Sequence, residues 1–284
     1  MEKQFFARPA VYVGEVHIKV KHMERAIHFY RSVLGFRVMK QDHHEVVLTA
    51  DGRTPLLTLH EPQGVAEKEN RTTGLYHFAI LLPNRSDFAA FLRHILQSGQ
   101  QLGAADHLVS EALYFSDPDG NGIEVYHDRP SNLWQWENRQ VSMTTDPLDA
   151  NDILAEPDIA WQGLPEHTLM GHIHLHVSDL EEAEAFYVQG LGFRIATTYP
   201  GALFLSTADY HHHIGLNVWN GNGAKKPSAK SVGLEWFSLI FPDKTSRDLA
   251  VDRLQAQHVT TVWMGSDVVV EDPAGNRIHL KASE

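Results

Sequence analysis

"HLVSEALYFSDPDGNGIEVY", residues 107–126, places two apolar segments on either side of the turn sequence DPDGNG. Glycine supplies the positive φ that such a turn requires, so the stretch predicts a strand, a tight turn and a second strand. The turn itself does not need His107, Tyr114 or Glu124, which lie on or beside the flanking strands. These three side chains therefore call for a functional explanation.

The same pattern returns later in the chain, which indicates internal repeats. EDPAGNRIHLK (271–281) repeats the strand–turn–strand, and GLYHFAILLP (74–83) aligns without a gap with GLEWFSLIFP (233–242). GEVHIKVKHMERAIHFYRSVLGFRV (14–38) likewise aligns with GHIHLHVSDLEEAEAFYVQGLGFRI (171–195). We therefore expect an α+β fold of four βαβββ units of about 50 residues each, numbered one to four along the chain.

Local signals mark where the helices of units one and three begin and end. Ser178 and Glu181 have the spacing of a capping box at the start of a helix. Gly35 and Gly192 follow the last apolar residues of the two helical patterns, where a helix typically ends.

The segment between units two and three differs in composition from the repeats. Residues 129–168 mix polar residues with proline and tryptophan, which predicts an ordered connector packed on the surface. We expect a first domain over 10–128, this connector over 129–168, and a second domain over 169–284.

Composition limits the classes of function. The formal net charge is −12 and no basic stripe is present, so nucleic acid is not an expected partner. The sequence contains no run of eighteen apolar residues, so we expect no membrane span. The start MEKQFFARPAVYVGEVH does not resemble a signal peptide. A cytoplasmic protein is the expectation. The absence of cysteine excludes thiolate chemistry, and the 19 histidines prompt a check of their positions in the chain.

The unit architecture resembles the vicinal oxygen chelate superfamily, which includes glyoxalases and extradiol ring-cleaving dioxygenases. That resemblance implies two cup-shaped barrels, the glyoxalase/bleomycin resistance/dihydroxybiphenyl dioxygenase fold, with a metal in a cup. The opening stretch resembles the extradiol dioxygenase signature more specifically. The matching residues, with a mild departure at Ala105, are His107, Leu113, Tyr114, Asp117, Pro118, Gly120 and Glu124.

The resemblance also implies a ligand set of two histidines and one carboxylate, which suits Fe(II). At the family's ligand positions, unit two carries His77 and Glu124. Unit four carries Trp236 and His279 there, so it has lost the pattern.

Either His17 of unit one or His174 of unit three completes the expected site. The family places a catalytic histidine in a His-His run, and unit three has His211, His212 and His213 where unit one has Arg53, Thr54 and Pro55. We therefore expect units two and three to share one cup, with His77, Glu124 and His174 as metal ligands, while units one and four form a structural cup. Because residues 172, 174 and 176 share a strand face, only the resemblance singles out His174. A second metal at His279 or the 211–213 run stays open.

The function that the resemblance implies is extradiol cleavage of catechol or a substituted catechol, with Fe(II) or Mn(II) and O₂. His212 would exchange protons with the substrate, and His107 and Tyr114 would hydrogen-bond a substrate oxygen. Phe115, Trp219 and Phe237 are candidate wall residues. The alternatives are a glyoxalase-type lyase or isomerase using zinc or nickel, and a non-enzymatic resistance protein that binds small molecules. The oligomeric state is open, and a homo-oligomer is compatible with exposed sheet edges.

Overall fold

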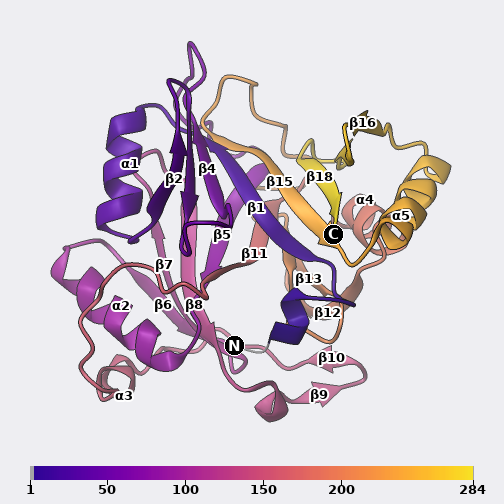
Figure 1. The fold of residues 1–284 in the computed structure, drawn as a ribbon. Coiled ribbons are helices and arrows are strands. Elements are labelled where there is room, and N and C mark those ends of the chain that lie inside the picture. Colours follow the sequence, from indigo (N-terminus) through magenta and orange to yellow (C-terminus); the bar gives the residue numbers. More distant parts are fainter. Residues whose placement is uncertain (1–2, 284) are drawn as a thin grey trace.

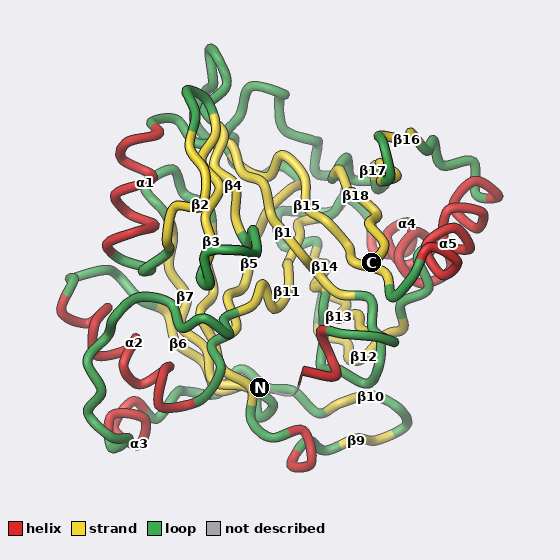
Figure 2. The backbone as a smooth tube through the Cα atoms, in the orientation of Figure 1, coloured by secondary structure: helices red, strands yellow, loops and turns green. Residues whose placement is uncertain are grey.

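Two curved eight-stranded sheets form the body of the protein in the computed structural model, which describes residues 3–283. Figures 1 and 2 show the strands in the middle of the molecule and the helices at its periphery. Each unit has the predicted order of one strand, one helical segment and three strands, so the α+β fold of four βαβββ units is confirmed.

The elements of the first half follow the repeats closely. Unit one comprises β1 (Tyr12–Lys19), α1 (Met23–Ser32), β2 (Arg37–Gln41), β3 (Glu45–Thr49) and β4 (Leu57–His60), after the short η1 (Lys3–Phe6). Unit two comprises β5 (Gly74–Leu81), α2 (Arg85–Gln97), β6 (Gly103–Asp106), β7 (Ser110–Ser116) and β8 (Gly122–Asp128).

The second half repeats the order after a structured connector. The connector holds η2 (Ser131–Leu133), β9 (Trp136–Glu137), β10 (Gln140–Val141) and α3 (Ala150–Leu154). Unit three comprises β11 (Leu169–His176), α4 (Leu180–Glu184), η3 (Ala185–Gly190), β12 (Arg194–Tyr199), β13 (Ala202–Ser206) and β14 (Ile214–Asn217). Unit four comprises β15 (Gly233–Phe241), α5 (Lys244–Ala256), β16 (Val262–Met264), β17 (Asp267–Glu271) and β18 (Arg277–Ala282).

The sheets combine units from opposite halves of the chain. One sheet has the order β12-β13-β14-β11-β5-β8-β7-β6 and therefore joins units three and two. The other, β16-β17-β18-β15-β1-β4-β3-β2, joins units four and one. The prediction that units two and three share one cup is confirmed. We call their sheet the site sheet and the other the plain sheet.

Helix ends agree with the sequence in part. Gly35 and Gly192 adopt φ of +82° and +89° just after the helical segments, as expected for residues that end a helix. The capping prediction was wrong by one residue. Asp179, not Ser178, is the N-cap of α4, because its carboxylate accepts from the backbone N–H groups of Glu181 and Glu182.

One apolar core connects the sheets, and its main cluster includes residues of all four units. A repeated polar contact crosses it. The hydroxyl of Tyr30 in α1 donates to Asp117 in the turn after β7 (2.8 Å), and Tyr187 in η3 donates to Asp272 in the matching turn (2.9 Å). Each Asp-Pro turn is therefore tied to the helical segment of the preceding unit.

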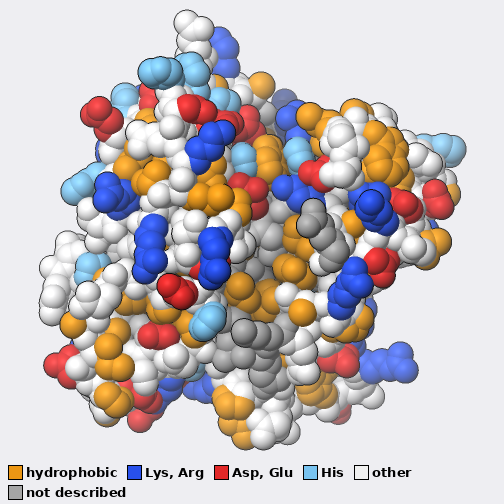
Figure 3. Space-filling model, in the orientation of Figure 1, with side chains coloured by type: hydrophobic (Ala, Val, Ile, Leu, Met, Phe, Trp, Pro, Cys, Tyr) orange, Lys and Arg blue, Asp and Glu red, His pale blue; other side chains and the backbone are white. Residues whose placement is uncertain are grey.

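Within residues 3–283 no helix is long and apolar enough to cross a membrane. On the face drawn in Figure 3, acidic, basic and apolar side chains are interspersed rather than gathered by charge.

Candidate metal centre

Three buried side chains meet on the site sheet, one from each of three neighbouring strands. His77 comes from β5, Glu124 from β8 and His172 from β11. The Oε2 atom of Glu124 lies 3.0 Å from Nε2 of His77 and 3.0 Å from Nε2 of His172. One ligand atom from each residue falls within 4.8 Å of the others. Strand pairing brings these positions together, since β5 lies between β8 and β11.

The donor set fits a divalent metal ion. Glu124 is only 2% exposed, and a carboxylate buried to this degree is costly unless it is paired. Burial alone would raise the pKa of Glu124, but His172 and His77 outweigh it and hold the pKa well below its usual range. The buried Nε2 atom of His77 lies 3.0 Å from Glu124 without the geometry of a hydrogen bond, and no other described residue pairs with it. Two imidazoles and one carboxylate are the ligands of the facial triad that holds Fe(II).

His174 differs from the expectation, because His172 takes its place in the cluster. Nε2 of His174 accepts a hydrogen bond from Nδ2 of Asn217 (3.0 Å). The orientation of that amide is set by the backbone N–H of Trp219, which donates to Oδ1 of Asn217 (3.1 Å). The Nε2 lone pair of His174 is therefore already used. His174 still lines the site, with its ring centre 5.0 Å from that of His77.

His17 and His279 lie on the plain sheet, away from this cluster. Both rings stack on the indole of Trp236, with ring centres 3.5 Å and 4.0 Å from it. Nε2 of His17 also lies 2.9 Å from Glu15. Neither histidine belongs to a potential metal cluster among the described residues.

His107 and Tyr114 form one hydrogen-bonded pair beside the cluster. Nδ1 of His107 lies 2.6 Å from the carbonyl oxygen of Thr144, and Nε2 lies 2.6 Å from the hydroxyl of Tyr114. A carbonyl can only accept, so Nδ1 of His107 carries an N–H group and donates to Thr144, while Nε2 pairs with the Tyr114 hydroxyl. Burial, with Glu124 nearby, raises the pKa of Tyr114 well above its usual value. The phenol therefore keeps its proton at neutral pH.

The three consecutive histidines have three different surroundings. His213 donates through Nε2 to the carbonyl oxygen of Phe5 (2.9 Å), and His211 contacts Asp128 (2.8 Å). Only His212 lines the site. Burial, reinforced by His172 and His211, lowers the pKa of His212 well below its usual range. The run does not act as one metal-binding group among the described residues.

A cavity of about 320 Å³, at the lower end of the usual range for ligand sites, is lined by His77, Glu124, His107, Tyr114 and His212. His172 lies behind this lining, in contact with Glu124 and His212. Trp219 lines the cavity as expected, but Phe115 and Phe237 are buried in the core, so these two predictions were wrong. Its further walls are formed by Tyr76, Gly103, Ala104, Ala105, Met143, Thr144, Thr145, His174, Thr197, Thr198, Tyr199 and Phe204.

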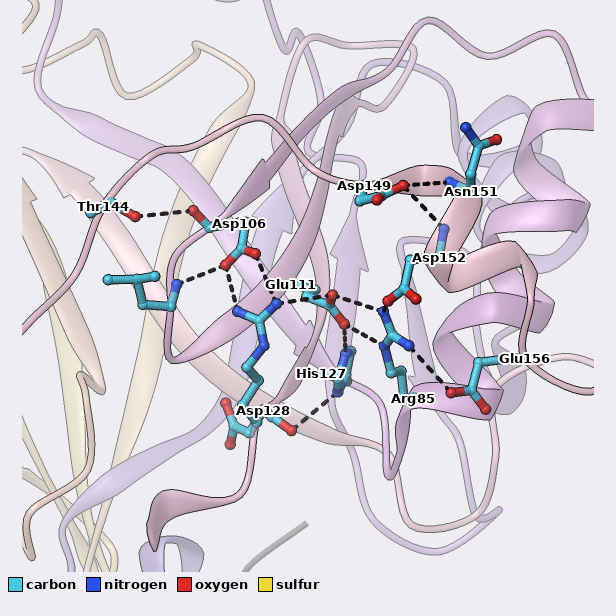
Figure 4. Close-up of polar contacts among 12 residues, drawn as sticks. Arg85, Asp106, Glu111, His127, Asp128, Thr144, Asp149, Asn151, Asp152 and Glu156 are labelled. Atoms are coloured by element: carbon cyan, nitrogen blue, oxygen red, sulfur yellow. Dashed lines mark hydrogen bonds and ion pairs between the residues drawn. The ribbon is translucent and has the colours of Figure 1, made fainter. Parts of the chain in front are cut away.

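The connector supplies part of the wall, which the sequence did not indicate. Met143, Thr144 and Thr145 line the cavity. Figure 4 shows the salt bridges between the connector and unit two. Arg85 of α2 contacts both Glu111 of β7 (2.8 Å) and Asp152 of α3 (2.5 Å).

A second arm of the same network supports the loop that carries His107. Arg129 contacts Asp106 (2.5 Å) and Glu111 (3.1 Å), and the carboxylate of Asp106 also accepts from the backbone N–H of Leu108 (2.8 Å). The backbone of Asp106 and that of Asp146 in the connector exchange two hydrogen bonds (2.9 Å each). These contacts hold the backbone next to both His107 and Thr144 in place.

Comparison with known proteins agrees with this geometry. The model of the Glyoxalase/Bleomycin resistance protein/Dioxygenase superfamily matches residues 12–125 and 169–280. A catechol-2,3-dioxygenase of Bacillus subtilis (strain 168) is 43% identical over 267 residues, which cover 92% of this chain and 94% of that protein. The expected similarity to catechol 2,3-dioxygenases is thus confirmed.

Two further comparisons are more distant. A biphenyl-2,3-diol 1,2-dioxygenase of Rhodococcus globerulus is 27% identical over 121 residues, covering 39% of this chain and 62% of that protein. The structure of glyoxalase I from Zea mays matches with a TM-score of 0.59 at 15% identity, covering 95% of this chain and 92% of that one. The latter likeness concerns the fold. This chain belongs to the Glyoxalase/Bleomycin resistance protein/Dioxygenase superfamily.

Proposed function

We propose that the protein is an extradiol dioxygenase that cleaves the ring of catechol or a substituted catechol, with Fe(II) as cofactor and O₂ as second substrate. The observation that carries this proposal is the cluster of His77, Glu124 and His172, two of whose members, His77 and Glu124, line a cavity together with His212 and the His107–Tyr114 pair. The 43% identical catechol-2,3-dioxygenase supports the same reaction class.

In this proposal, His77 and His172 bind the metal through Nε2 and Glu124 binds it through its carboxylate. Bound Fe(II) would supply open coordination positions for a diol and O₂ and the redox chemistry that amino-acid side chains alone lack. His172 takes the role that the sequence assigned to His174. We assign His174 to the cavity wall, where Asn217 holds its ring.

The other polar side chains handle protons. His212 is neutral because burial lowers its pKa, so it can accept a proton from a hydroxyl of the diol and return it later. The Tyr114 hydroxyl can turn from His107 towards a substrate oxygen and donate to it, while Thr144 keeps His107 in place.

The walls indicate the kind of catechol that fits. Glu124 is the only charged side chain other than histidine among the described lining residues, and no lysine or arginine lines the cavity. A carboxylate substituent would therefore be buried without a counter-charge. We propose that the substrate carries hydrogen or small neutral substituents.

The experiment is an oxygen-uptake assay of protein reconstituted anaerobically with Fe(II), with catechol, 4-methylcatechol and 3,4-dihydroxybenzoate as substrates. We expect one O₂ consumed per catechol, a yellow ring-cleavage product, and much slower turnover of the carboxylated compound. No O₂ uptake with either neutral catechol would overturn the proposal. Turnover of a glyoxalase-type substrate by zinc- or nickel-loaded protein in the absence of O₂ would favour the lyase instead.

A further inference from the structure

We propose that Asp128 and His211 determine which nitrogen of His212 carries the proton, and that they leave Nε2 of His212 unprotonated towards the cavity. This inference rests on the proposed function for the role of His212. Neither Asp128 nor His211 lines the cavity, so both would be positioning residues that act through His212.

Asp128, the last residue of β8, collects hydrogen-bond donors. Nε2 of His211 lies 2.8 Å from its Oδ1 atom. The hydroxyl of Tyr210 lies 3.1 Å and 3.2 Å from the two carboxylate oxygens, and the hydroxyl of Tyr126 lies 2.8 Å from that of Tyr210. A carboxylate can only accept, so Tyr210 donates to Asp128, Tyr126 donates to Tyr210, and Nε2 of His211 carries a proton.

The protonation of His211 fixes that of His212. In the proposed arrangement His211 has a single N–H group, at Nε2, so its Nδ1 atom holds a lone pair. Nδ1 of His211 and Nδ1 of His212 are 2.8 Å apart. Two lone pairs facing each other would repel, so Nδ1 of His212 carries the proton and donates. The lone pair of His212 is then at Nε2, the nitrogen on the other side of the ring from His211.

Packing prevents the two rings from adopting another arrangement. His211 is fully buried, with its ring centre 4.0 Å from that of Tyr210 and 5.2 Å from that of Trp134 in the connector. His212 is 5% exposed and lies between His172 and Phe204, at 4.1 Å and 5.0 Å. A ring flip at either residue would break the contact with Asp128 or the contact between the histidines.

This arrangement has a consequence for the proposed reaction. With its lone pair at Nε2, His212 can accept a proton from the substrate. With a proton at Nε2, His212 would be a donor towards the substrate and could not accept one there. Loss of His211 should therefore reduce kcat rather than weaken substrate binding, since the residue does not touch the cavity.

The direct test is long-range ¹H–¹⁵N correlation spectroscopy of the histidine rings. It would be recorded on full-length ¹⁵N-labelled protein, without iron and after loading with diamagnetic Zn²⁺, with the His212 signals assigned from the His212→Ala variant. We expect a protonated Nδ1 and an unprotonated Nε2 for His212 in the wild type. A protonated Nε2 on His212 would overturn the proposal, and this reading requires no activity.

The second test uses matched variants. His211→Leu removes the acceptor for His212, His211→Asn keeps an oxygen near the position of Nδ1, and His213→Gln is the control from the same run. We expect His211→Leu to lower kcat about 10²-fold with little change in KM, His211→Asn to restore part of it, and His213→Gln to have little effect. Adding His211→Leu to His212→Ala should cause no further loss, because the two residues act as a unit.

Equal activities of His211→Leu and wild type, or of His211→Leu and His211→Asn, would contradict the proposal. Failure of the proposed function has a different signature. In that case the wild type would cleave no catechol, while the ring nitrogens of His212 would still show the expected protonation.

Discussion

The two sheets have the same strand order and carry different residues at the same positions. Where the site sheet has His77, Glu124 and Tyr114, the plain sheet has Trp236, His279 and Val269. His77 faces His174 across the β5–β11 pair, and Trp236 faces His17 across the β15–β1 pair in the same way. The plain sheet therefore holds an aromatic stack where the site sheet holds its cluster.

Other residues are the same in both sheets. Asp117 and Asp272 each accept from a tyrosine hydroxyl and from the asparagine four residues later. Because this contact occurs in the sheet without a candidate metal site, it stabilises the turn rather than taking part in chemistry. The comparison teaches that the Asp-Pro-x-Gly-Asn turn belongs to the fold, and that a few strand positions carry the function.

The largest expected effect comes from replacing Glu124 by glutamine, with the same replacement of its counterpart His279 as the control. Glu124→Gln should lose bound iron and ring-cleaving activity, because the amide has no negative charge to offer a metal. His279→Gln at the matching position should keep both. Iron content by mass spectrometry and O₂ uptake measure the two variants, and loss of iron in His279→Gln would refute the division between the sheets.

The choice between His172 and His174 is the next test. His172→Ala should reduce iron content to background, whereas His174→Ala should retain iron and lose only part of its activity, since Asn217 already occupies the Nε2 atom of His174. The reverse result, with iron kept by His172→Ala and lost by His174→Ala, would restore the ligand set expected from the sequence.

The repeated tyrosines should behave alike in both sheets. Tyr30→Phe and Tyr187→Phe each remove one hydrogen bond to a buried aspartate, so each should lower the free energy of unfolding by about 2 kcal/mol. Urea denaturation with iron content measured in parallel would check this. A loss of iron from either variant, in a folded protein, would show that the turn contact is not purely structural.

The smallest effect concerns Glu111, which has no acidic counterpart in the plain sheet, where Ser266 occupies the matching position. Burial alone would raise the pKa of Glu111, but hydrogen bonds from His127 and Arg85 outweigh it and lower the pKa from 4.5 to about 2. The stability that Glu111 contributes is therefore present above pH 4.5 and lost as the pH falls towards 2.

The measurement is the difference in unfolding free energy between the wild type and Glu111→Gln, from urea titrations between pH 6 and pH 3. The wild type should be the more stable protein at pH 6, and its advantage should shrink as the pH falls. An advantage independent of pH would mean that the charge of Glu111 does not support the connector.

Much of this arrangement could be predicted from the sequence. The repeats gave the four units, and the position of the His211–His213 run in unit three correctly paired that unit with unit two, which the sheet order bears out. His77, Glu124, His107, Tyr114 and His212 were expected around one site, and all five line the same cavity.

Two features could not be predicted, for physical reasons. Residues 172, 174 and 176 share one strand face, so alternation alone cannot rank them. Irregularities in the pairing of β11 with β5, and the hydrogen bond from Asn217, distinguish His172 from His174 only in three dimensions. The connector has no repeat pattern, and its place against the site depends on contacts such as Arg85–Asp152 between distant parts of the chain.

The most direct measurement is anomalous X-ray diffraction at the iron absorption edge from crystals of the Fe(II)-loaded protein. We expect one anomalous peak on the site sheet, within bonding distance of His77, His172 and Glu124, and none beside Trp236. A peak between His17 and His279, or one bound by His174 in place of His172, would contradict the account.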